Sequence, residues 1–402
     1  MRVSWFQAVL PASENAPKAS MAAFFLVFVL AVSLISKWAS LHLAGLLLFF
    51  SVGFARRADW RTPAMQTYLL CTALWLIPVL LTAGLQHGLG VATAPEWKEL
   101  PVLVMRMLGI GLGLIVLVQR GWLTLYSATL ALLAALSIHA GAGVVDWIFT
   151  PDASLHKWRE LRVNGLLYNP NPFGTFMALA AILAAGLLRN SPHRMAIWTI
   201  LIAALLGVWV SGSRSALLVA GVGFVILFPP TRRKHWYFYL GAVVLAALFF
   251  WYTSLRTYSL YSASDNERLM ALSYTLEKIR MAPWIGWGIG AYEGLPDRVG
   301  PQSPHNMLLD LAFNSGLPVL VAWVLSTALL VSRLRRSEHA AARLALALLA
   351  AAIMAGMTEY SILLSTHFRG IWVLVTALAC CTLGTSVAIS TPPTTLRASP
   401  AP

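Results

Sequence analysis

Three short polar stretches interrupt an otherwise apolar sequence at points where chemistry on an anion is possible. Residues 169–174 read Asn-Pro-Asn-Pro-Phe-Gly, residues 211–215 read Ser-Gly-Ser-Arg-Ser, and residues 303–306 read Ser-Pro-His-Asn. Each precedes an apolar run, and Asn, Ser and Pro are typical of helix starts, with Asn171 and Ser303 as predicted caps. A helix N-terminus carries partial positive charge and free N–H groups, which suit a phosphate. The three stretches therefore predict anion-binding helix starts.

Ionisable side chains in or beyond these stretches are candidates for chemistry. Arg214 could bind a phosphate through two hydrogen bonds, or it could extend to lipid headgroups. Arg268 could bind an anion or remain a solvated charge, and His305 could transfer a proton near neutral pH or only begin a helix. Asp310 lies within an apolar run, so we expect it to face a cavity or a partner. Glu359 is expected near the same membrane surface, in a structural role.

The elements that must position these residues are apolar helices. Hydrophobic residues make up 58% of the 402-residue chain, charged residues make up 11%, and the mean hydropathy is +0.72. A soluble domain carries about 25% charged residues. Apolar runs of roughly 18 residues or more, long enough to cross a bilayer, recur along the chain. We therefore predict an all-α polytopic membrane protein with residues 1–402 forming a single integral membrane domain.

The apolar runs predict about twelve transmembrane helices. The first is expected to be a retained span and not a cleaved signal peptide, because another span follows it at once. The predicted spans are residues 20–36, 39–55, 64–86, 100–118, 122–146, 172–188, 195–211, 214–229, 236–253, 304–332, 338–360 and 367–388.

The cations predict the orientation of these spans. The net charge is +14, and most of the cations lie in short loops between spans, which are expected to be cytoplasmic. Both termini are then cytoplasmic, and the three polar stretches begin helices on the outer side. This distribution accounts for the positive charge without a nucleic-acid partner.

The largest outer segment is predicted to be the loop of residues 254–303, inserted between spans nine and ten. Ser264 and Glu267 have the spacing of a capping box, and Pro283 is expected to end the helix that follows. Four apolar residues fall on one face of that helix: Leu269, Leu272, Leu276 and Ile279. The pattern predicts an amphipathic helix at the membrane surface.

The order of these features resembles the bacterial O-antigen ligase family, within a wider group that includes O-antigen polymerases. Four local matches carry the resemblance: Arg162-Val163-Asn164-Gly165 leading to Asn169-Pro170-Asn171; Ser213-Arg214-Ser215; Arg268 with Leu272; and His305-Asn306 followed, after nine residues, by Gly316. The family pattern expects Gly, Thr or Tyr three residues after that glycine, where this chain has Val319.

The resemblance implies a glycosyltransferase of lipopolysaccharide biosynthesis. The enzyme would transfer a preassembled glycan from undecaprenyl diphosphate to a sugar hydroxyl of lipid A–core, at the periplasmic face of the bacterial inner membrane. Besides donor and acceptor, its expected partners are membrane lipids. The implied catalytic residues are His305, Arg214 and Arg268, and the implied substrate-binding residues are Arg162, Asn169, Asn171 and Asn306. No cofactor or metal is expected, because arginines would take the place of a divalent ion on the diphosphate.

Several alternatives stay open at this point. An O-antigen polymerase or a protein O-oligosaccharyltransferase would use the same lipid-linked donor. A membrane transporter is the alternative from a different class. His305 could act as a general base in its neutral form or bind the diphosphate as an imidazolium ion.

Overall fold

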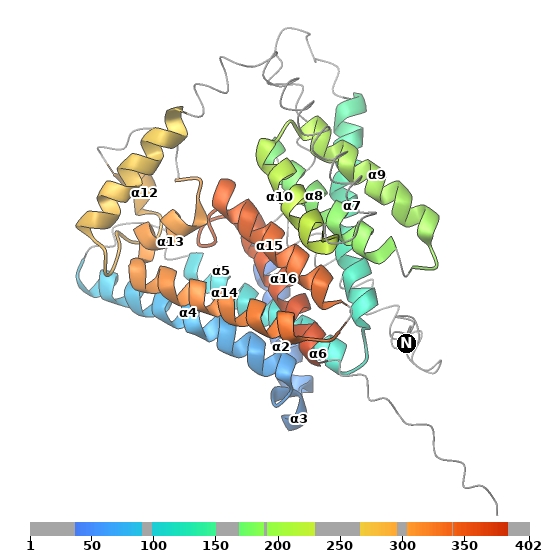
Figure 1. The fold of residues 1–402 in the computed structure, drawn as a ribbon. Coiled ribbons are helices and arrows are strands. Elements are labelled where there is room, and N and C mark those ends of the chain that lie inside the picture. Colours follow the sequence, from blue (N-terminus) through green and yellow to red (C-terminus); the bar gives the residue numbers. More distant parts are fainter. Residues whose placement is uncertain are drawn as a thin grey trace, which may run out of the picture.

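The structure, a computed structural model, describes residues 37–90, 99–149, 169–188, 191–229, 266–295, 304–339 and 341–384. The regular elements in these ranges are all helices (Figure 1), which confirms the predicted fold class. They are α2 (Lys37–Phe54), α3 (Arg57–Trp60), α4 (Pro63–Gly88), α5 (Glu99–Met105), the π-helix η3 (Arg106–Gly111), α6 (Leu112–Gln119), α7 (Leu125–Phe149), α8 (Pro170–Leu188), α9 (Arg194–Ser211), α10 (Arg214–Leu227), a helix over residues 266–281, α12 (Ala291–Gly294), α13 (Met307–Ser315), α14 (Leu317–Arg336), α15 (Ala342–Thr358) and α16 (Thr366–Gly384).

Six helical segments in the described ranges are long and apolar enough to cross a membrane. They are Pro63–Gly88, Glu99–Gln119, Leu125–Gly143, Pro170–Leu188, Arg194–Ser211 and Leu317–Arg336. Shorter apolar helices occupy Leu41–Phe54, Arg214–Leu227, Ala342–Thr358 and Phe368–Leu383. The chain is thus a multi-pass membrane protein. The predicted spans 20–36 and 236–253 lie outside the described residues, so the total of twelve stays a prediction.

The two ends of the bundle differ, as the contacts of α4 show. Near the start of α4, Thr67 accepts a hydrogen bond from Arg333 at the end of α14. Near its end, the side-chain amide of Gln86 donates to the carbonyl oxygen of Asn314 in α13, at 2.7 Å. The bundle therefore has one end that carries the cations of α14 and an opposite end that carries α13.

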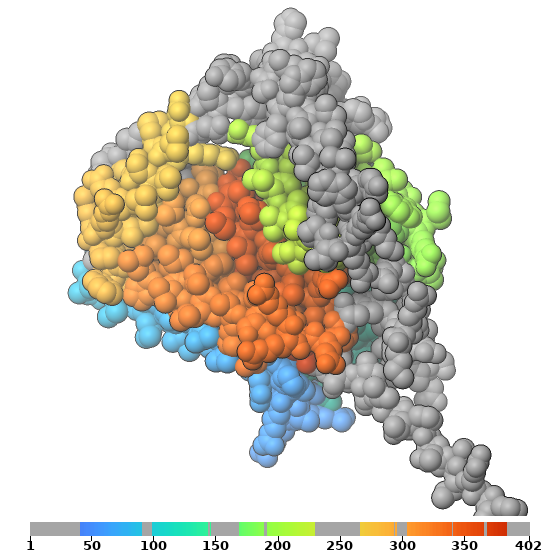
Figure 2. Space-filling view, in the orientation of Figure 1, coloured from blue at the N-terminus to red at the C-terminus, as the bar shows by residue number. Residues whose placement is uncertain are grey.

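The predicted span over residues 304–332 is wrong in one respect, because it consists of two helices that break at Gly316. Gly316 has φ 86°, and Gly286 in the preceding turn has φ 68°, so both adopt backbone conformations that favour glycine. The two glycines let these backbone segments approach closely, and Leu317 N donates to Pro283 O at 2.7 Å. Figure 2 shows residues 266–295 as a gold layer over the orange surface of the helices beyond this break.

Gly316→Ala should destabilise the protein. A Cβ at this position would overlap the carbonyl oxygen of Trp284 and would also be strained by the positive φ. We expect the free energy of unfolding to fall by roughly 3 kcal/mol. Thermal unfolding in detergent, followed by tryptophan fluorescence, measures the change. Gly221→Ala in α10 is the matched control, since nothing lies within 4 Å of its Cβ position; equal midpoints for the two variants would contradict the account of the break.

Candidate active site

The carboxylate of Glu359, directly after α15, joins side chains from four other segments. Its side chain is only 7% exposed, and its Oε1 lies 2.7 Å from Nη2 of Arg268. Asn171 Nδ2 donates to Oε2 at 3.1 Å, and Ser215 Oγ donates to Oε1 at 3.4 Å. Nδ1 of His305 lies 3.8 Å from Oε2, an ion-pair distance. Residues far apart in the sequence therefore form one polar cluster at the end of α15.

The start of α8 differs from the prediction by two residues. The helix begins at Pro170, and the side chain of Asn169 caps it by accepting a hydrogen bond from Asn171 N at 2.9 Å. Asn171 was the predicted cap. Because Asn169 takes that role, the side chain of Asn171 lies within the first turn and can reach Glu359.

The start of α10 agrees with the prediction. Gly212, with φ 60°, ends α9, and Ser213 caps α10 by accepting a hydrogen bond from Ala216 N at 3.2 Å. Arg214 is the first residue of the helix and is half-buried. In α8, a Cβ on Gly174 would lie 2.9 Å from the Cβ of Ala216. The missing side chain of this glycine lets the first turns of α8 and α10 approach closely enough to share the Glu359 carboxylate.

His305 precedes a helix start that also differs from the prediction. The predicted cap, Ser303, lies outside the described residues, and α13 begins at Met307 with Asn306 as its cap. Asn306 Oδ1 accepts hydrogen bonds from two backbone N–H groups of α13, while its Nδ2 donates to Met357 O at 3.0 Å. All three predicted helix starts therefore meet at the end of α15.

The backbone of His305 adopts a conformation that is rare for residues other than glycine. Its φ is 48°, in the left-handed region. Such a conformation costs free energy and persists only where neighbouring contacts hold it. The capping and tethering by Asn306 on one side provide such contacts. The imidazole is thereby held facing Glu359, with its side chain 31% exposed.

Burial lowers the pKa of His305 below its usual range, because desolvation disfavours the charged imidazolium. The carboxylate of Glu359 acts in the opposite direction, Arg268 lowers the pKa further, and Glu267 raises it. Burial is the largest of these effects, so the pKa of His305 lies below its usual range. A neutral imidazole is then favoured near pH 7, and a neutral imidazole has one ring nitrogen that can accept a proton.

The helix over residues 266–281 carries Arg268 and ends before Pro283 as predicted, but only three of the four residues predicted on its apolar face share an exposed surface. The face packed on the protein consists of Ala271, Thr275, Lys278 and Ile279. Ile279 was predicted on the same face as three leucines, but it is buried against the protein, whereas the leucines are exposed: Leu269 by 62%, Leu272 by 38% and Leu276 by 42%. The helix thus has an apolar surface directed away from the bundle.

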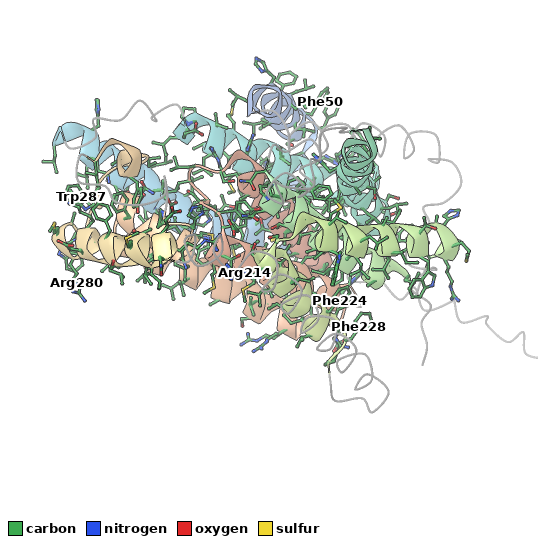
Figure 3. All side chains as sticks on the ribbon, turned by 90° about the horizontal axis from the view of Figure 1, so that it is seen from above. Phe50, Arg214, Phe224, Phe228, Arg280 and Trp287 are labelled. Carbon is green, nitrogen blue, oxygen red and sulfur yellow. The ribbon has the colours of Figure 1, made fainter. Side chains whose placement is uncertain are left out.

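Figure 3 orients this helix relative to the site. Arg280 and Trp287 lie at its outer end, and Arg214 lies toward the centre of the molecule, beyond its other end. Indole Nε1 of Trp287 donates to Lys278 O at 2.7 Å, which fixes the outer end of the helix. The other end is fixed by the ion pair between Arg268 and Glu359.

The structure brings together most of the residues that the sequence suggested. His305, Arg268 and Asn171 meet at Glu359, Asn306 tethers the neighbouring helix start, and Arg214 adjoins Ser215 of the cluster. Asn169 caps α8 through Asn171 N, and Arg162 lies outside the described residues. The sequence had given Glu359 only a structural role. The available signal was a carboxylate after an apolar helix, on the side of several outer cations, in a chain with only 15 acidic residues.

Comparison with known proteins gives one family. Residues 198–324 match a family model described as O-antigen ligase. The matched segment contains Arg214, Arg268 and His305, whereas Asn171 and Glu359 lie outside it. No curated protein matches the chain.

The Arg268–Glu359 ion pair should contribute measurably to stability. A double-mutant cycle with Arg268→Ala and Glu359→Gln is expected to give a coupling energy of about 1 kcal/mol, a modest value because the arginine side chain is 37% exposed. Chemical unfolding in detergent measures it. A second cycle with Arg280→Ala and Glu359→Gln should give no coupling, since the two arginines lie about 18 Å apart along the helix. Equal coupling in both cycles would exclude a specific pair.

Proposed function

We propose that the chain transfers a preassembled glycan from undecaprenyl diphosphate to a sugar hydroxyl of lipid A–core, because residues 198–324 match the O-antigen ligase family model, whose members transfer glycosyl groups. The observation that carries this proposal is the cluster around Glu359. It places a candidate base, His305, and a candidate phosphate ligand, Arg268, on the same carboxylate. The starts of α8, α10 and α13 converge there with their partial positive charges.

The arginines would bind the diphosphate of the donor. A guanidinium has five N–H donors, and the contact with Glu359 is made by Nη2 of Arg268. The partly exposed side chain can therefore offer other N–H groups to phosphate oxygens. Arg214, at the first residue of α10, adds a second cation beside a helix N-terminus. Fixed positive groups stabilise the charge that develops on the leaving diphosphate.

His305 would act as the general base. In the proposed step, the basic ring nitrogen of the neutral imidazole takes the proton from the acceptor hydroxyl, and the oxygen forms a bond to the anomeric carbon of the donor glycan. The bond from that carbon to the diphosphate oxygen breaks, and its electron pair leaves with undecaprenyl diphosphate. The Glu359 carboxylate, 3.8 Å from Nδ1, would stabilise the imidazolium that forms. A direct displacement of this kind inverts the anomeric carbon.

The distribution of cations supports a periplasmic site. Arg120 pairs with Asp59 at 2.8 Å, and Arg333 contacts Thr67, so these cations gather around the start of α4. The candidate site lies at the opposite end, with α13. Cytoplasmic loops are enriched in Arg and Lys. We therefore place the cationic end and both termini in the cytoplasm, and the site at the periplasmic surface of the bacterial inner membrane.

The outward apolar stripe of the 266–281 helix supports the same placement. Leu269, Leu272 and Leu276 follow directly after Arg268 and are exposed on the protein, and Trp284 beyond them is 73% exposed. Leucines and tryptophans at a helix surface suit the boundary between headgroups and hydrocarbon. On this proposal the helix lies at the outer membrane surface, where the diphosphate of a lipid-linked donor also lies.

Transfer should depend on the three proposed catalytic residues and not on a metal. Purified protein in proteoliposomes, supplied with lipid-linked O-antigen, lipid A–core and a chelator, should produce lipid A–core carrying glycan ladders on a gel. His305→Ala, Arg214→Ala and Arg268→Ala should each reduce the rate by about 100-fold or more. Arg280→Ala, at the outer end of the same helix, should leave it within about twofold of the wild type, since its side chain is exposed.

Other products would contradict the proposal. Longer lipid-linked glycans, formed without lipid A–core, would identify a polymerase. Glycan on a protein hydroxyl would identify an oligosaccharyltransferase. Transport of a lipid-linked glycan without any covalent product would favour the transporter.

The rate of transfer should fall on acidification. Burial lowers the pKa of His305 below its ordinary value of about 6.5, so the imidazole is neutral at pH 7 and becomes protonated only at lower pH. A general base then loses activity as pH falls through that lowered pKa, with half-maximal rate below about pH 6.5. The initial rate of transfer, measured between about pH 5 and pH 8, tests this decrease. A rate that rises on acidification through the same range would indicate an imidazolium that binds phosphate.

A further inference from the structure

A hydrogen-bonded series of buried polar side chains lies next to the candidate site. Asp310 in α13 is 1% exposed, Asn314 in the same helix is 0% exposed, and Ser361 after α15 is 8% exposed. Asp310 Oδ1 accepts a hydrogen bond from Asn314 Nδ2 at 2.8 Å, and Asp310 Oδ2 accepts one from Ser361 Oγ. Both oxygens of the buried carboxylate are thereby occupied. None of these three residues has a role in the proposed chemistry.

At one end of this series, Ser361 fixes the segment that carries Glu359. Ser361 follows Glu359 by two residues, and its Oγ accepts hydrogen bonds from Leu363 N at 3.1 Å and from Leu364 N at 2.9 Å. The same hydroxyl donates to Asp310. Ser361 therefore organises the connection between α15 and α16, and Asp310 attaches that connection to α13.

The other end fixes the turn that follows the 266–281 helix. Asn314 Oδ1 accepts a hydrogen bond from Gly290 N at 3.1 Å, and Asn314 O accepts one from Gly288 N at 3.1 Å. The turn leads back along the helix to Arg268, which pairs with Glu359. One path from Glu359 runs through Ser361 to Asp310, and the other runs through Arg268, its helix and Asn314 to Asp310. Asp310 therefore joins the two paths.

We propose that Asp310 is a positioning residue, which acts through the hydroxyl of Ser361 to hold the carboxylate of Glu359 against His305 and Arg268. The catalytic consequence of this inference rests on the proposed function, but the placement of Glu359 does not. A buried hydrogen bond could instead contribute only to stability. The two alternatives differ at His305: only the positioning role changes the electrostatic environment of the imidazole.

The charges that act on His305 come from two neighbouring segments. Glu359, after α15, raises its pKa, as does Glu267 of the 266–281 helix, whereas Arg268 of that helix lowers it. Loss of the Asp310–Ser361 hydrogen bond would loosen Glu359, the strongest of these charges. The pKa of His305 should then fall further, by at least about 0.5 unit, since a nearby opposite charge shifts a pKa by about 1–3 units.

Two variants break the same hydrogen bond in different ways. Ser361→Ala removes the donor. Asp310→Asn replaces an acceptor oxygen with an NH₂ group. This NH₂ group cannot donate well to Ser361 Oγ, because two backbone N–H groups already occupy the lone pairs of that oxygen. The other amide orientation would set this NH₂ against the donor Nδ2 of Asn314. If one variant does not fold, the other still tests the bond, and the double variant should show no additional effect.

Ser326→Ala is the matched control for loss of a buried hydroxyl. Ser326 in α14 is 5% exposed and donates to Cys71 O in α4 at 2.7 Å. Its removal likewise breaks one buried hydrogen bond between helices. It should lower the thermal midpoint without affecting His305.

The experiment measures the rate at which diethylpyrocarbonate modifies His305, as a function of pH, on the full-length protein in proteoliposomes. The reagent reacts with neutral imidazole, and mass spectrometry of the His305 peptide separates this histidine from the others. We expect Ser361→Ala and Asp310→Asn to move the midpoint to lower pH by at least about 0.5 unit, and Ser326→Ala to keep the wild-type midpoint. Glycan transfer by the first two should fall about tenfold, as misplacement of catalytic groups predicts.

Wild-type midpoints in both Asp310→Asn and Ser361→Ala would overturn the positioning role. A wild-type protein that transfers no glycan would contradict the proposed function instead. The labelling midpoints would still decide whether Asp310 positions Glu359, because they require no turnover.

Discussion

The candidate site depends on the cost of burying the carboxylate of Glu359 at the end of an apolar bundle. A buried charge is tolerated only where its oxygens are paired and hydrogen-bonded. Here the partners come from α8, α10 and the 266–281 helix, while His305 approaches from the segment before α13. No single helix could supply them all. The requirement to satisfy one carboxylate therefore determines how the ends of several helices lie relative to one another.

The apolar helices supply the rigidity on which this arrangement relies, and their close contacts are made where side chains are small. Gly174 brings the first turn of α8 against α10, next to the cluster. Gly316 and Gly286 bring the start of α14 against the turn that follows the 266–281 helix. These contacts lie at helix ends on the side of the site. Dispersion between apolar helices is non-directional, so the glycines and the buried hydrogen bonds give the bundle its particular geometry.

The sequence predicted the helices well because apolar runs are their direct cause, but it predicted their ends less well. Asn169 and Asn171 are both good caps. Asn169 caps α8, and the side chain of Asn171 binds Glu359 instead, which the sequence could not indicate. The break at Gly316 had local signals, a glycine followed two residues later by a proline, yet the apolar run continues through it. Leu269 and Ile279 illustrate a different limit: periodicity placed both residues on one apolar face, yet Leu269 is exposed and Ile279 is buried against the protein.

Glu359 could not be assigned from spacing, because its partners lie up to 188 residues away in the sequence. Arg268 and His305 both approach this carboxylate, so a change at one of them should affect the other during the proposed reaction. While Arg268 is paired with Glu359, its positive charge offsets the effect of the carboxylate on the imidazole. A donor diphosphate that takes hydrogen bonds from Arg268 would compete with Glu359 for that cation and free the carboxylate for His305. The histidine would then be a stronger base when the donor is bound than when the site is empty, since an unshared carboxylate stabilises the imidazolium more. On the proposed function, the same ion pair that stabilises the empty site would couple donor binding to activation of the base.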